Sequence, residues 1–196
     1  MKKRPYKMRK RAEDKRRTRE RIVEATVELH GSVGPKNTTI SAVAERAGVQ
    51  RLTVYRHFPD EFALFSACSA HWSSLNPPPG FEEWGQIADP AGRTGAALSA
   101  LYAYYRRTAS MLRLVYRDRD EVEALAGPIE GFQAYLDAIR DDLAAAWKPK
   151  GRKPALLTAA IAHGLAFSTW SSLSGLGLSD PRMSRLVRGW IEATAG

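Results

Sequence analysis

Residues 40–59, ISAVAERAGVQRLTVYRHFP, constrain the fold more than any other segment, because their spacing is that of two short helices packed around a tight turn. Such a pair needs a small residue where the helices cross, and Ala44 occupies that position. It also needs a glycine four residues later that can adopt a left-handed conformation, and Gly48 stands there. The apolar residues that would lock the two helices together are Val43, Val49 and Val54. The segment therefore predicts a helix-turn-helix.

Helical signals also dominate the rest of the chain. Apolar residues recur every three or four positions before Gly31, and Thr39 and Asp60 are placed as N-caps of helices that end near Arg46 and Ser74. Beyond the proline-rich residues 76–80, the same periodicity predicts a long helix from residue 93, which residues 111–119 either continue or follow as a separate short helix. Further helices are predicted over residues 128–147, ended by Pro149 and Gly151, and over residues 180–191. No segment shows the alternation of a strand, so we expect an all-α fold.

The positive charge of the chain is concentrated near its N-terminus. The net charge is +9, and residues 1–21 hold twelve Lys or Arg against three acidic residues, so the remainder is neutral overall. A block of like charge is usually a solvated, disordered tail, and a basic one binds polyanions by releasing their counterions. Charge alone leaves three interpretations open: nucleic-acid binding, a solubilising tail, and contact with a membrane surface.

Composition and motifs argue against a metalloprotein, an enzyme and a membrane protein. Cys68 is the single cysteine and has no zinc-ligand spacing around it, which fits the reducing cytoplasm best. The four histidines are scattered, so we expect no metal. No nucleophile-elbow, phosphate-loop or metalloprotease motif occurs, so we expect neither enzymatic activity nor a cofactor. Residues 154–179 carry no charge but contain too many Ser, Thr and Gly for a membrane span.

The side chains of the second motif helix that point away from the first helix suit a DNA groove. Arg51 and Gln50 can make bidentate hydrogen bonds to guanine and adenine edges, whereas threonine, tyrosine and histidine typically reach phosphate oxygens. Leu52 and Tyr55, beside two arginines, would leave apolar surface exposed without a partner, which argues against a plain solvated face. The residues predicted to contact double-stranded DNA are Thr39, Gln50, Arg51, Leu52, Thr53, Tyr55, Arg56 and His57.

This segment resembles the N-terminal DNA-binding domain of the tetracycline-repressor (TetR) family of transcriptional regulators. The similarity covers residues 19–75, and above all TTISAVAERAGVQRLTVYRHFPD, in which Thr53, Tyr55 and Phe58 match the end of the family's third helix. Two further segments, 100–118 and 163–173, resemble parts of the family's C-terminal regulatory domain. The resemblance implies a homodimer on a near-palindromic operator, usually a repressor that a small effector releases.

The fourth helix departs from the family pattern. The family often has a lysine at the start of this helix, where it meets a DNA phosphate, and Glu61 occupies that position here. The next position, usually a glutamate in the family, is Phe62, so an alignment shifted by one residue is the alternative. A glutamate would repel the phosphate, and the basic tail can compensate as an arm that reaches the duplex.

The sequence thus predicts four parts. Residues 1–18 form a basic flexible tail, and residues 19–75 form a three-helix helix-turn-helix DNA-binding domain. Residues 76–92 form a proline-rich connector, and residues 93–196 form a helical regulatory domain for effector binding and dimerisation.

A dimer interface is expected outside residues 1–75, because a helix-turn-helix monomer reads too few base pairs to be selective. Between Ala155 and Leu176, small residues recur four and three apart and form a seam that would let two helices approach closely. In the family, the last two long helices of each subunit build a four-helix interface. The predicted interface residues, for which intramolecular core is the alternative, are Ala159, Ala162, Ala166, Thr169, Leu173, Met183, Leu186, Val187 and Trp190.

The C-terminal domain is rich in aromatic residues. Apolar cavities lined by tyrosine and tryptophan are a common way for helical bundles to hold small hydrophobic ligands, although most of these side chains are expected in the core. The predicted effector-pocket residues are Tyr102, Tyr105, Met111, Phe132, Tyr135, Phe167 and Trp170.

The sequence therefore predicts a cytoplasmic, homodimeric, sequence-specific DNA-binding transcriptional regulator, a repressor released by a small, largely apolar effector. The alternative is a non-specific or architectural nucleic-acid-binding protein driven by the basic tail. Affinity of the second kind would fall steeply with salt on every duplex alike.

Overall fold

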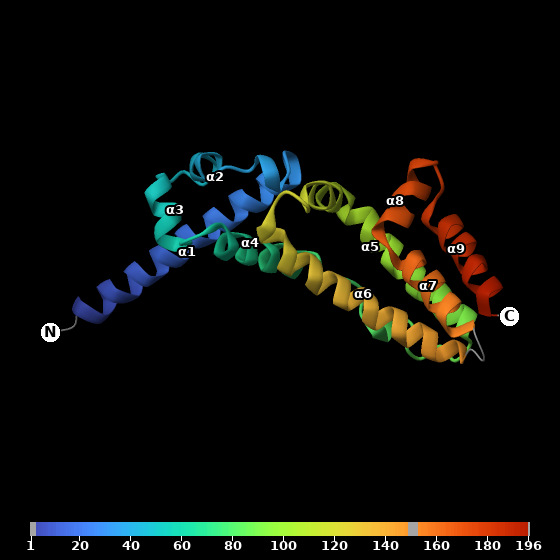
Figure 1. Ribbon diagram of the computed structural model, residues 1–196. Helices are drawn as coiled ribbons and strands as arrows, with labels where there is room; N and C mark the ends of the chain where they lie inside the picture. Colours follow the sequence, from blue (N-terminus) through green and yellow to red (C-terminus); the bar gives the residue numbers. More distant parts are fainter. Residues whose placement is uncertain (1–2, 149–152, 196) are drawn as a thin grey trace. The chain divides into compact units, whose positions relative to one another are not determined.

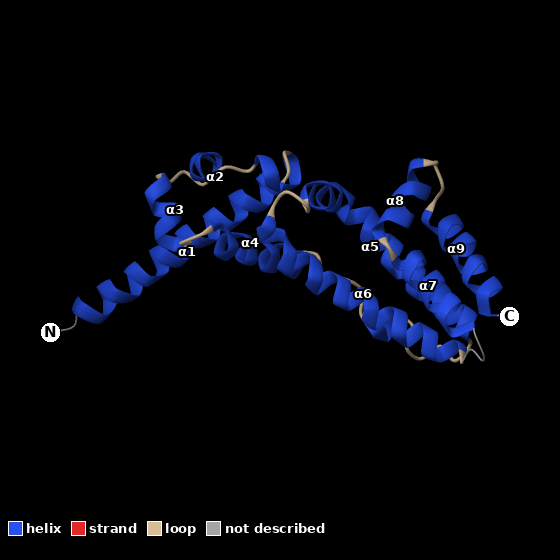
Figure 2. Ribbon diagram, viewed as in Figure 1, coloured by secondary structure: helices blue, strands red, loops and turns tan. Residues whose placement is uncertain are grey.

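The computed structural model describes residues 3–148 and 153–195, and over these residues the chain consists of helices joined by loops, as Figure 2 shows. The α-helices are α1 (Lys3–Ser32), α2 (Ile40–Arg46), α3 (Arg51–His57), α4 (Glu61–Leu75), α5 (Pro90–Asp118), α6 (Ala126–Trp147), α7 (Lys153–Leu165), α8 (Phe167–Gly175) and α9 (Asp180–Ala195). Three short 3-10 helices, η1 (Pro35–Asn37), η2 (Phe81–Glu83) and η3 (Glu123–Leu125), lie in the connections. The predicted all-α fold is confirmed.

The chain divides into two compact units, which we call unit 1 and unit 2. Unit 1 contains residues 1–77 and 110–128, and unit 2 contains residues 78–109 and 129–196. Helix α5 therefore contributes its first part to unit 2 and its last part to unit 1. None of the described helices is both long enough and apolar enough to cross a membrane.

Unit 1 is built on α1, which packs against α2 and α4, while α2 packs against α3 (Figure 1). The side chains that fill its core are almost inaccessible to solvent: Ile22, Val23, Val43, Val54, Phe58, Leu64, Phe65 and Cys68. Burying one large apolar side chain stabilises a fold by roughly 1.5–3 kcal/mol. This core fixes the positions of the two short helices of the predicted motif.

Helix α1 begins much earlier than the sequence predicted. The structure continues it back to Lys3, so the flexible tail expected over residues 1–18 is helical as far as it is described, with residues 1–2 outside the described part. Residues 6–30 contain neither glycine nor proline. Pairs such as Arg16 with Glu20, with an N–O distance of 2.7 Å, stabilise successive turns. The excess of positive charge in residues 1–21 does not predict this helix, because it suggests repulsion between neighbouring side chains and does not reveal the individual ion pairs between arginine and glutamate.

The expected connector over residues 76–92 belongs mostly to unit 2 and is folded. Trp84 is fully buried, and its Nε1 donates a hydrogen bond of 3.2 Å to Oδ2 of Asp142 on α6. Arg93 donates from Nε to the same oxygen, at 3.1 Å. Helix α5 starts at Pro90, which suits the first turn of a helix because that turn needs no N–H donor. The boundary between the units falls between Pro77 and Pro78.

The uncharged residues 154–179 contribute to two helices, α7 and α8, whereas the predicted seam of small residues required a single continuous helix. Helix α7 ends at Leu165, and Ala166 has the extended dihedral angles φ −67° and ψ 137° before α8 begins. The prediction of one continuous seam from Ala155 to Leu176 is therefore wrong. Helix α6 ends at Trp147, and the predicted stop at Pro149 and Gly151 lies outside the described residues.

Side-chain hydroxyls from other parts of unit 2 stabilise the break between α7 and α8. Tyr102 donates to the carbonyl oxygen of Gly164 at 2.8 Å, and Tyr105 donates to that of Leu165 at 2.7 Å. Thr169 donates to the carbonyl oxygen of His163 at 2.6 Å. A buried carbonyl without a partner costs about 1–3 kcal/mol, so these bonds make the break tolerable. The two tyrosine bonds come from residues at least 60 positions away, so no local sequence pattern reports them.

Candidate nucleic-acid interface

The turn between α2 and α3 has the geometry that its sequence predicts. Thr39 caps α2, and its hydroxyl accepts a hydrogen bond of 3.1 Å from the backbone N–H of Ala42. Gly48 has a φ of 64°, in the left-handed region that favours glycine. The backbone N–H of Val49 then donates to the carbonyl of Ala44 at 2.9 Å, which closes the turn.

The inner faces of the two helices are fixed by the residues that the spacing singled out. Val43 and Val54 are fully buried, and Ala44 is 3% exposed. Val49 is half-buried at the start of the connection to α3. Because α3 has only seven residues, it depends on this packing rather than on its own helix propensity. Its outer face is consequently held in a defined orientation.

That outer face carries most of the side chains predicted to contact DNA. Leu52 and Tyr55 are 58% and 46% exposed, which is unusual for side chains of their size. Gln50, Arg51 and Arg56 are also exposed, and Thr53 and His57 are half-buried. The structure thus brings seven of the predicted residues together on α3 and its N-cap. Thr39 lies apart from them, at the start of α2, where its hydroxyl is used for capping.

Two cations of α1 that the prediction did not include lie close to the end of α3. The guanidinium of Arg19 stacks over the ring of Phe58, 4.8 Å from its centroid. The pKa of His57 is lowered, first by burial and then by the positive charges of Lys15 and Arg19. The lowered pKa favours the neutral imidazole of His57, which can donate one hydrogen bond and accept another. The sequence offers one signal for these two residues: Lys15 and Arg19 are four positions apart, so on a helix they share a face.

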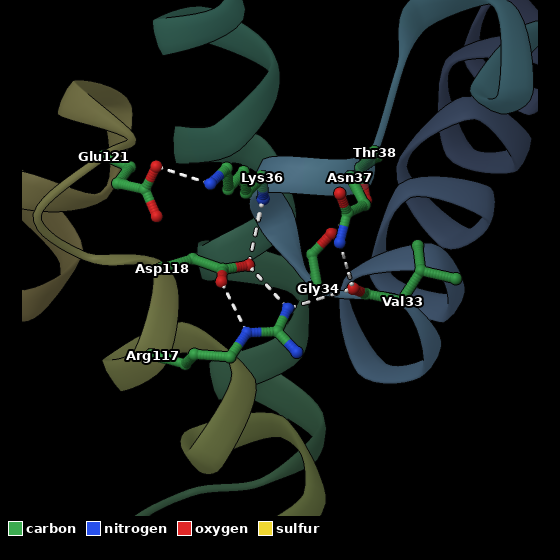
Figure 3. A network of polar contacts seen from close by, with 8 residues as sticks. All are labelled: Val33, Gly34, Lys36, Asn37, Thr38, Arg117, Asp118 and Glu121. Carbon is green, nitrogen blue, oxygen red and sulfur yellow. Dashed lines mark hydrogen bonds and ion pairs between the residues drawn. The ribbon is translucent and has the colours of Figure 1, made fainter.

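The loop between α1 and α2 is held by a polar network from the end of α5, within unit 1 (Figure 3). Asp118 is 2% exposed and accepts a hydrogen bond of 3.1 Å from the backbone N–H of Lys36. Arg117 binds the same carboxylate through Nε, at 2.6 Å, and reaches the carbonyl of Val33 at 3.1 Å. The Lys36 ammonium pairs with Glu121.

Charge and backbone geometry both favour this network. The pKa of Asp118 is lowered, chiefly by the hydrogen bonds from Arg117 and also by the N–H of Lys36. Gly34 has a φ of 94°, and a Cβ at that position would collide with the Arg117 and Asp118 side chains. The network thus fixes the loop that leads into α2. No sequence pattern reveals it, because its two halves are more than eighty residues apart.

The predicted effector-pocket residues form an aromatic cluster in unit 2, apart from Met111. Tyr105 lies at its centre, with ring centroids 5.3 Å from Phe167, 6.0 Å from Trp170 and 6.4 Å from Phe132. Tyr135 stacks on Phe132 at 5.7 Å, and Tyr102 stacks on Tyr105 at 6.4 Å. The rings pack against one another, as they would in an ordinary aromatic core.

Met111 and the tyrosine hydroxyls correct two details of the pocket prediction. Met111 belongs to unit 1, where its Cε lies beside Gly31 of α1. The hydroxyls of Tyr102 and Tyr105 are used by the carbonyl groups at the break between α7 and α8, so they are already paired within unit 2. Phe132 and Tyr135 are only half-buried.

The predicted dimer residues separate into exposed and buried groups. Ala159, Ala162, Leu186 and Trp190 are exposed, with Trp190 at 42%, and Ala166 is half-buried. Met183, Val187, Thr169 and Leu173 are at most 9% exposed and lie in the core of unit 2, so the prediction is corrected for these four. Val187 packs against Gly164, where an added Cβ would lie 2.7 Å from Cγ1 of the valine.

Comparison with known proteins agrees with this geometry. The family model of bacterial regulatory proteins, tetR family, matches residues 22–68, which include α2, the turn and α3. Residues 22–68 therefore carry the N-terminal domain of the TetR family. TetR-family proteins are transcriptional regulators and not enzymes, which agrees with the prediction of a non-enzymatic protein.

Individual TetR-type relatives extend the comparison. The chain is 36% identical over 62 residues to an uncharacterized HTH-type transcriptional regulator, TtgW, of Pseudomonas putida. The match covers 32% of this chain and 46% of that protein, which is less than half of its length.

Solved TetR-type structures match over most of the chain. A TetR-like transcriptional regulator from a Rhodococcus species has a TM-score of 0.62 at 16% identity, over 89% of this chain and 93% of the other. The TetR-family regulator PfmR from Thermus thermophilus has a TM-score of 0.58 at 17% identity, over 90% of this chain and 94% of the other. At these identities the match shows a shared fold.

Among the described residues, no group of three or more His, Cys, Asp or Glu side chains is placed to hold a metal ion. The expectation that the protein uses no metal and no cofactor stays a prediction.

Proposed function

We propose that the protein is a sequence-specific DNA-binding transcriptional regulator in which α3 reads base edges in the major groove. The observation that carries this proposal is the outer face of α3, where Gln50, Arg51 and Tyr55 are exposed on a helix whose inner face is fully packed. Arginine and glutamine are suited to bidentate contacts with guanine and adenine. Thr53 and His57 are half-buried, and their side chains are of the kinds that typically contact the sugar-phosphate backbone.

Selection of DNA from a random pool by the purified chain tests this proposal. Arg51→Ala is expected to alter or abolish the preferred sequence, because one good bidentate contact contributes about 1–3 kcal/mol of discrimination. Arg182→Ala removes the same charge from an exposed position in unit 2 and is the matched control, expected to keep the preference. If the selected pool shows no preferred sequence and affinity falls equally with salt on all duplexes, the protein is a non-specific binder.

We further propose that the protein acts as a homodimer, with an interface on the outer faces of α7 and α9. These two helices pack against each other within unit 2. Their outward faces carry exposed apolar side chains, with Leu156 at 64%, Leu186 at 41% and Trp190 at 42%. Ala159 and Ala162 beside them would allow a second copy to approach closely. A dimer would place two copies of α3 on a near-palindromic operator.

Sedimentation of an Ala162→Glu variant tests the interface, because a buried unpaired charge strongly disfavours association. The variant is expected to be monomeric and to bind the operator more weakly. Ala134→Glu, at an exposed position on α6, is the matched control and is expected to stay dimeric. A dimeric Ala162→Glu variant would place the interface elsewhere.

For regulation, we propose that a small, largely apolar effector enters the aromatic cluster around Tyr105 and releases DNA, so that the protein acts as a repressor in the cytoplasm. Half-buried Phe132 and Tyr135 offer the cluster's accessible edge. The aromatic dye anilinonaphthalene sulfonate serves as a probe. We expect the dye to bind saturably, and to bind more weakly to the Phe132→Ala variant but not to the Phe62→Ala variant. We also expect the protein to have a lower affinity for DNA when it is saturated with dye. Unchanged DNA affinity at saturating dye would contradict an effector site in this cluster.

A further inference from the structure

The first turns of α1 form a charged helical extension of unit 1. Residues 8–17 are all exposed, and the first fully buried side chain of α1 from Met8 onward is Ile22. Figure 1 shows this part of α1 running beyond α3. Because the segment is helical, its cations have fixed relative positions instead of sampling the conformations of a flexible tail.

The cations of this extension lie on two different faces. Arg16 and Arg17 pair with acidic residues on their own side of the helix, with N–O distances of 2.7 Å to Glu20 and 3.2 Å to Glu13. Another set, Arg11, Lys15 and Arg19, recurs at intervals of four residues and therefore shares a second face. In the described part of the chain, these three side chains have no carboxylate partner within ion-pair distance. We call Arg11, Lys15 and Arg19 the cationic edge.

The cationic edge continues the face of α1 that packs into unit 1. Three and seven residues after Arg19, the same face carries Ile22 and Thr26, both fully buried. At its end nearest the core, the edge meets the C-terminus of α3, where Arg19 lies over the ring of Phe58 at 4.8 Å. The influence of Lys15 and Arg19 on His57 places both charges near the last residue of α3.

We propose that Arg11, Lys15 and Arg19 follow the phosphate backbone beside the groove that α3 occupies, and so lengthen the DNA contact of each chain. This inference rests on the proposed function, because it requires α3 to lie against a duplex. The eight residues from Arg11 to Arg19 span about 12 Å along the helix axis. That length corresponds to three or four base-pair steps of about 3.4 Å each. Among the residues that the structure describes, the three cations have no carboxylate partner, and they lie in a row that ends next to α3. Such a row is suited to bind the regularly spaced phosphates of a duplex.

Two double variants of equal charge separate the cationic edge from the charge of α1 as a whole. Arg11→Gln with Lys15→Gln removes two members of the edge, and leaves Arg19 to pack on Phe58. Arg16→Gln with Arg17→Gln removes two charges from the paired face and is the matched control. Circular dichroism establishes whether both variants remain helical, and binding is measured from about 50 to about 300 mM salt, the range over which phosphate contacts change affinity strongly.

The edge variant is expected to lower the slope of log affinity against log salt by about 1.8, because each lost phosphate contact contributes about 0.9. At about 150 mM salt this corresponds to an affinity roughly 30-fold lower. The control variant is expected to change the slope by less than about 0.5, since its cations are already paired. Equal slopes for the two helical variants would show that α1 acts only through its overall charge and would overturn the inference.

Duplex length gives a second readout. Removing about four base pairs beyond the half-site, on the side where α1 would run, is expected to weaken wild-type binding and to leave the edge variant unchanged. Equal losses for both proteins would refute the inference.

The salt measurement is also made on a duplex without the preferred sequence. This second duplex separates the inference from the proposed function. The proposed function fails if neither duplex is preferred, whereas the inference fails if the edge variant and the control variant show the same salt dependence. A last control adds vesicles that contain anionic lipid. If the vesicles abolish duplex binding, and if this competition requires Arg11 and Lys15, the cationic edge binds a membrane surface and the proposal is overturned.

Discussion

Acidification is expected to destabilise unit 1 through one buried side chain, His30 on α1. The residue is 4% exposed, and its ring lies edge-on against Phe65 with centroids 4.5 Å apart. Its Nδ1 lies 3.5 Å from Sγ of Cys68, and its Nε2 has no hydrogen-bond partner among the described residues. Burial lowers the pKa of His30 from 6.5 to about 4, and the negative charge of Asp118 offsets part of that effect.

The direction of the pH effect follows from the two pKa values of His30. The unfolded chain binds a proton near pH 6.5, whereas the folded chain binds it only near pH 4, so the free energy of unfolding falls as the pH drops through this window. The full interval corresponds to roughly 3 kcal/mol, of which about 2.5 kcal/mol is lost between about pH 7.5 and about pH 4.5. Such a loss is a large fraction of the roughly 5–15 kcal/mol that is typical of domain stability.

The assay is urea unfolding at these two pH values, read by hydrogen exchange of peptides from α1 and α4, which report on unit 1 alone. His30→Phe cannot titrate and is expected to lose about 2.5 kcal/mol less than the wild type on acidification. His71→Gln, on α4 and half-exposed, is the control and is expected to behave as the wild type does. Equal losses for wild type and His30→Phe, or an NMR titration of His30 with a midpoint near its ordinary pKa of 6.5, would refute the reasoning.

Three further perturbations test the turn, the helix break and the loop network. Gly48→Ala and Gly177→Ala both force alanine into a left-handed conformation without a steric clash, so each is expected to destabilise its own unit by about 1–2 kcal/mol in thermal melts, while only the first weakens DNA binding. Tyr102→Phe leaves the buried carbonyl of Gly164 without its donor and is expected to lower the free energy of unfolding by about 1–3 kcal/mol in urea titrations. Asp118→Asn is expected to speed hydrogen exchange in the loop before α2, whereas Asp120→Asn, at a carboxylate 83% exposed, leaves it unchanged.

Much of the candidate site could be predicted because its signals are local. A cap at Thr39, a left-handed glycine at Gly48 and buried valines at positions 43 and 54 are all read within twenty residues, and the structure agrees with each. Backbone sterics and the helical period act over the same short distance. The outer face of α3 was therefore predictable, because it consists of the residues that do not pack between the two helices of the motif.

Other features depend on partners that lie far away in the sequence. A hydrophobic stripe can face a second copy of the chain or its own core, and the stripe on α9 has both kinds of residue, with Val187 buried and Trp190 exposed. The loop before α2 is held by Asp118, whose role no pattern near residue 36 reveals. Periodicity describes one helix at a time and contains no information about which element covers it.

The sequence by itself determined the helical class, the bend between α2 and α3 and the side chains that the bend turns outward, because short-range sterics and periodicity are written into consecutive residues. Only the tertiary structure decided where the uncharged segment breaks, since the hydroxyls of Tyr102 and Tyr105, which stabilise the break by binding two carbonyl groups at the end of α7, come from another helix. It also showed that the basic N-terminal residues continue α1 and that Arg19 lies over Phe58 next to the end of α3, because these positions are set by how α1 packs into unit 1.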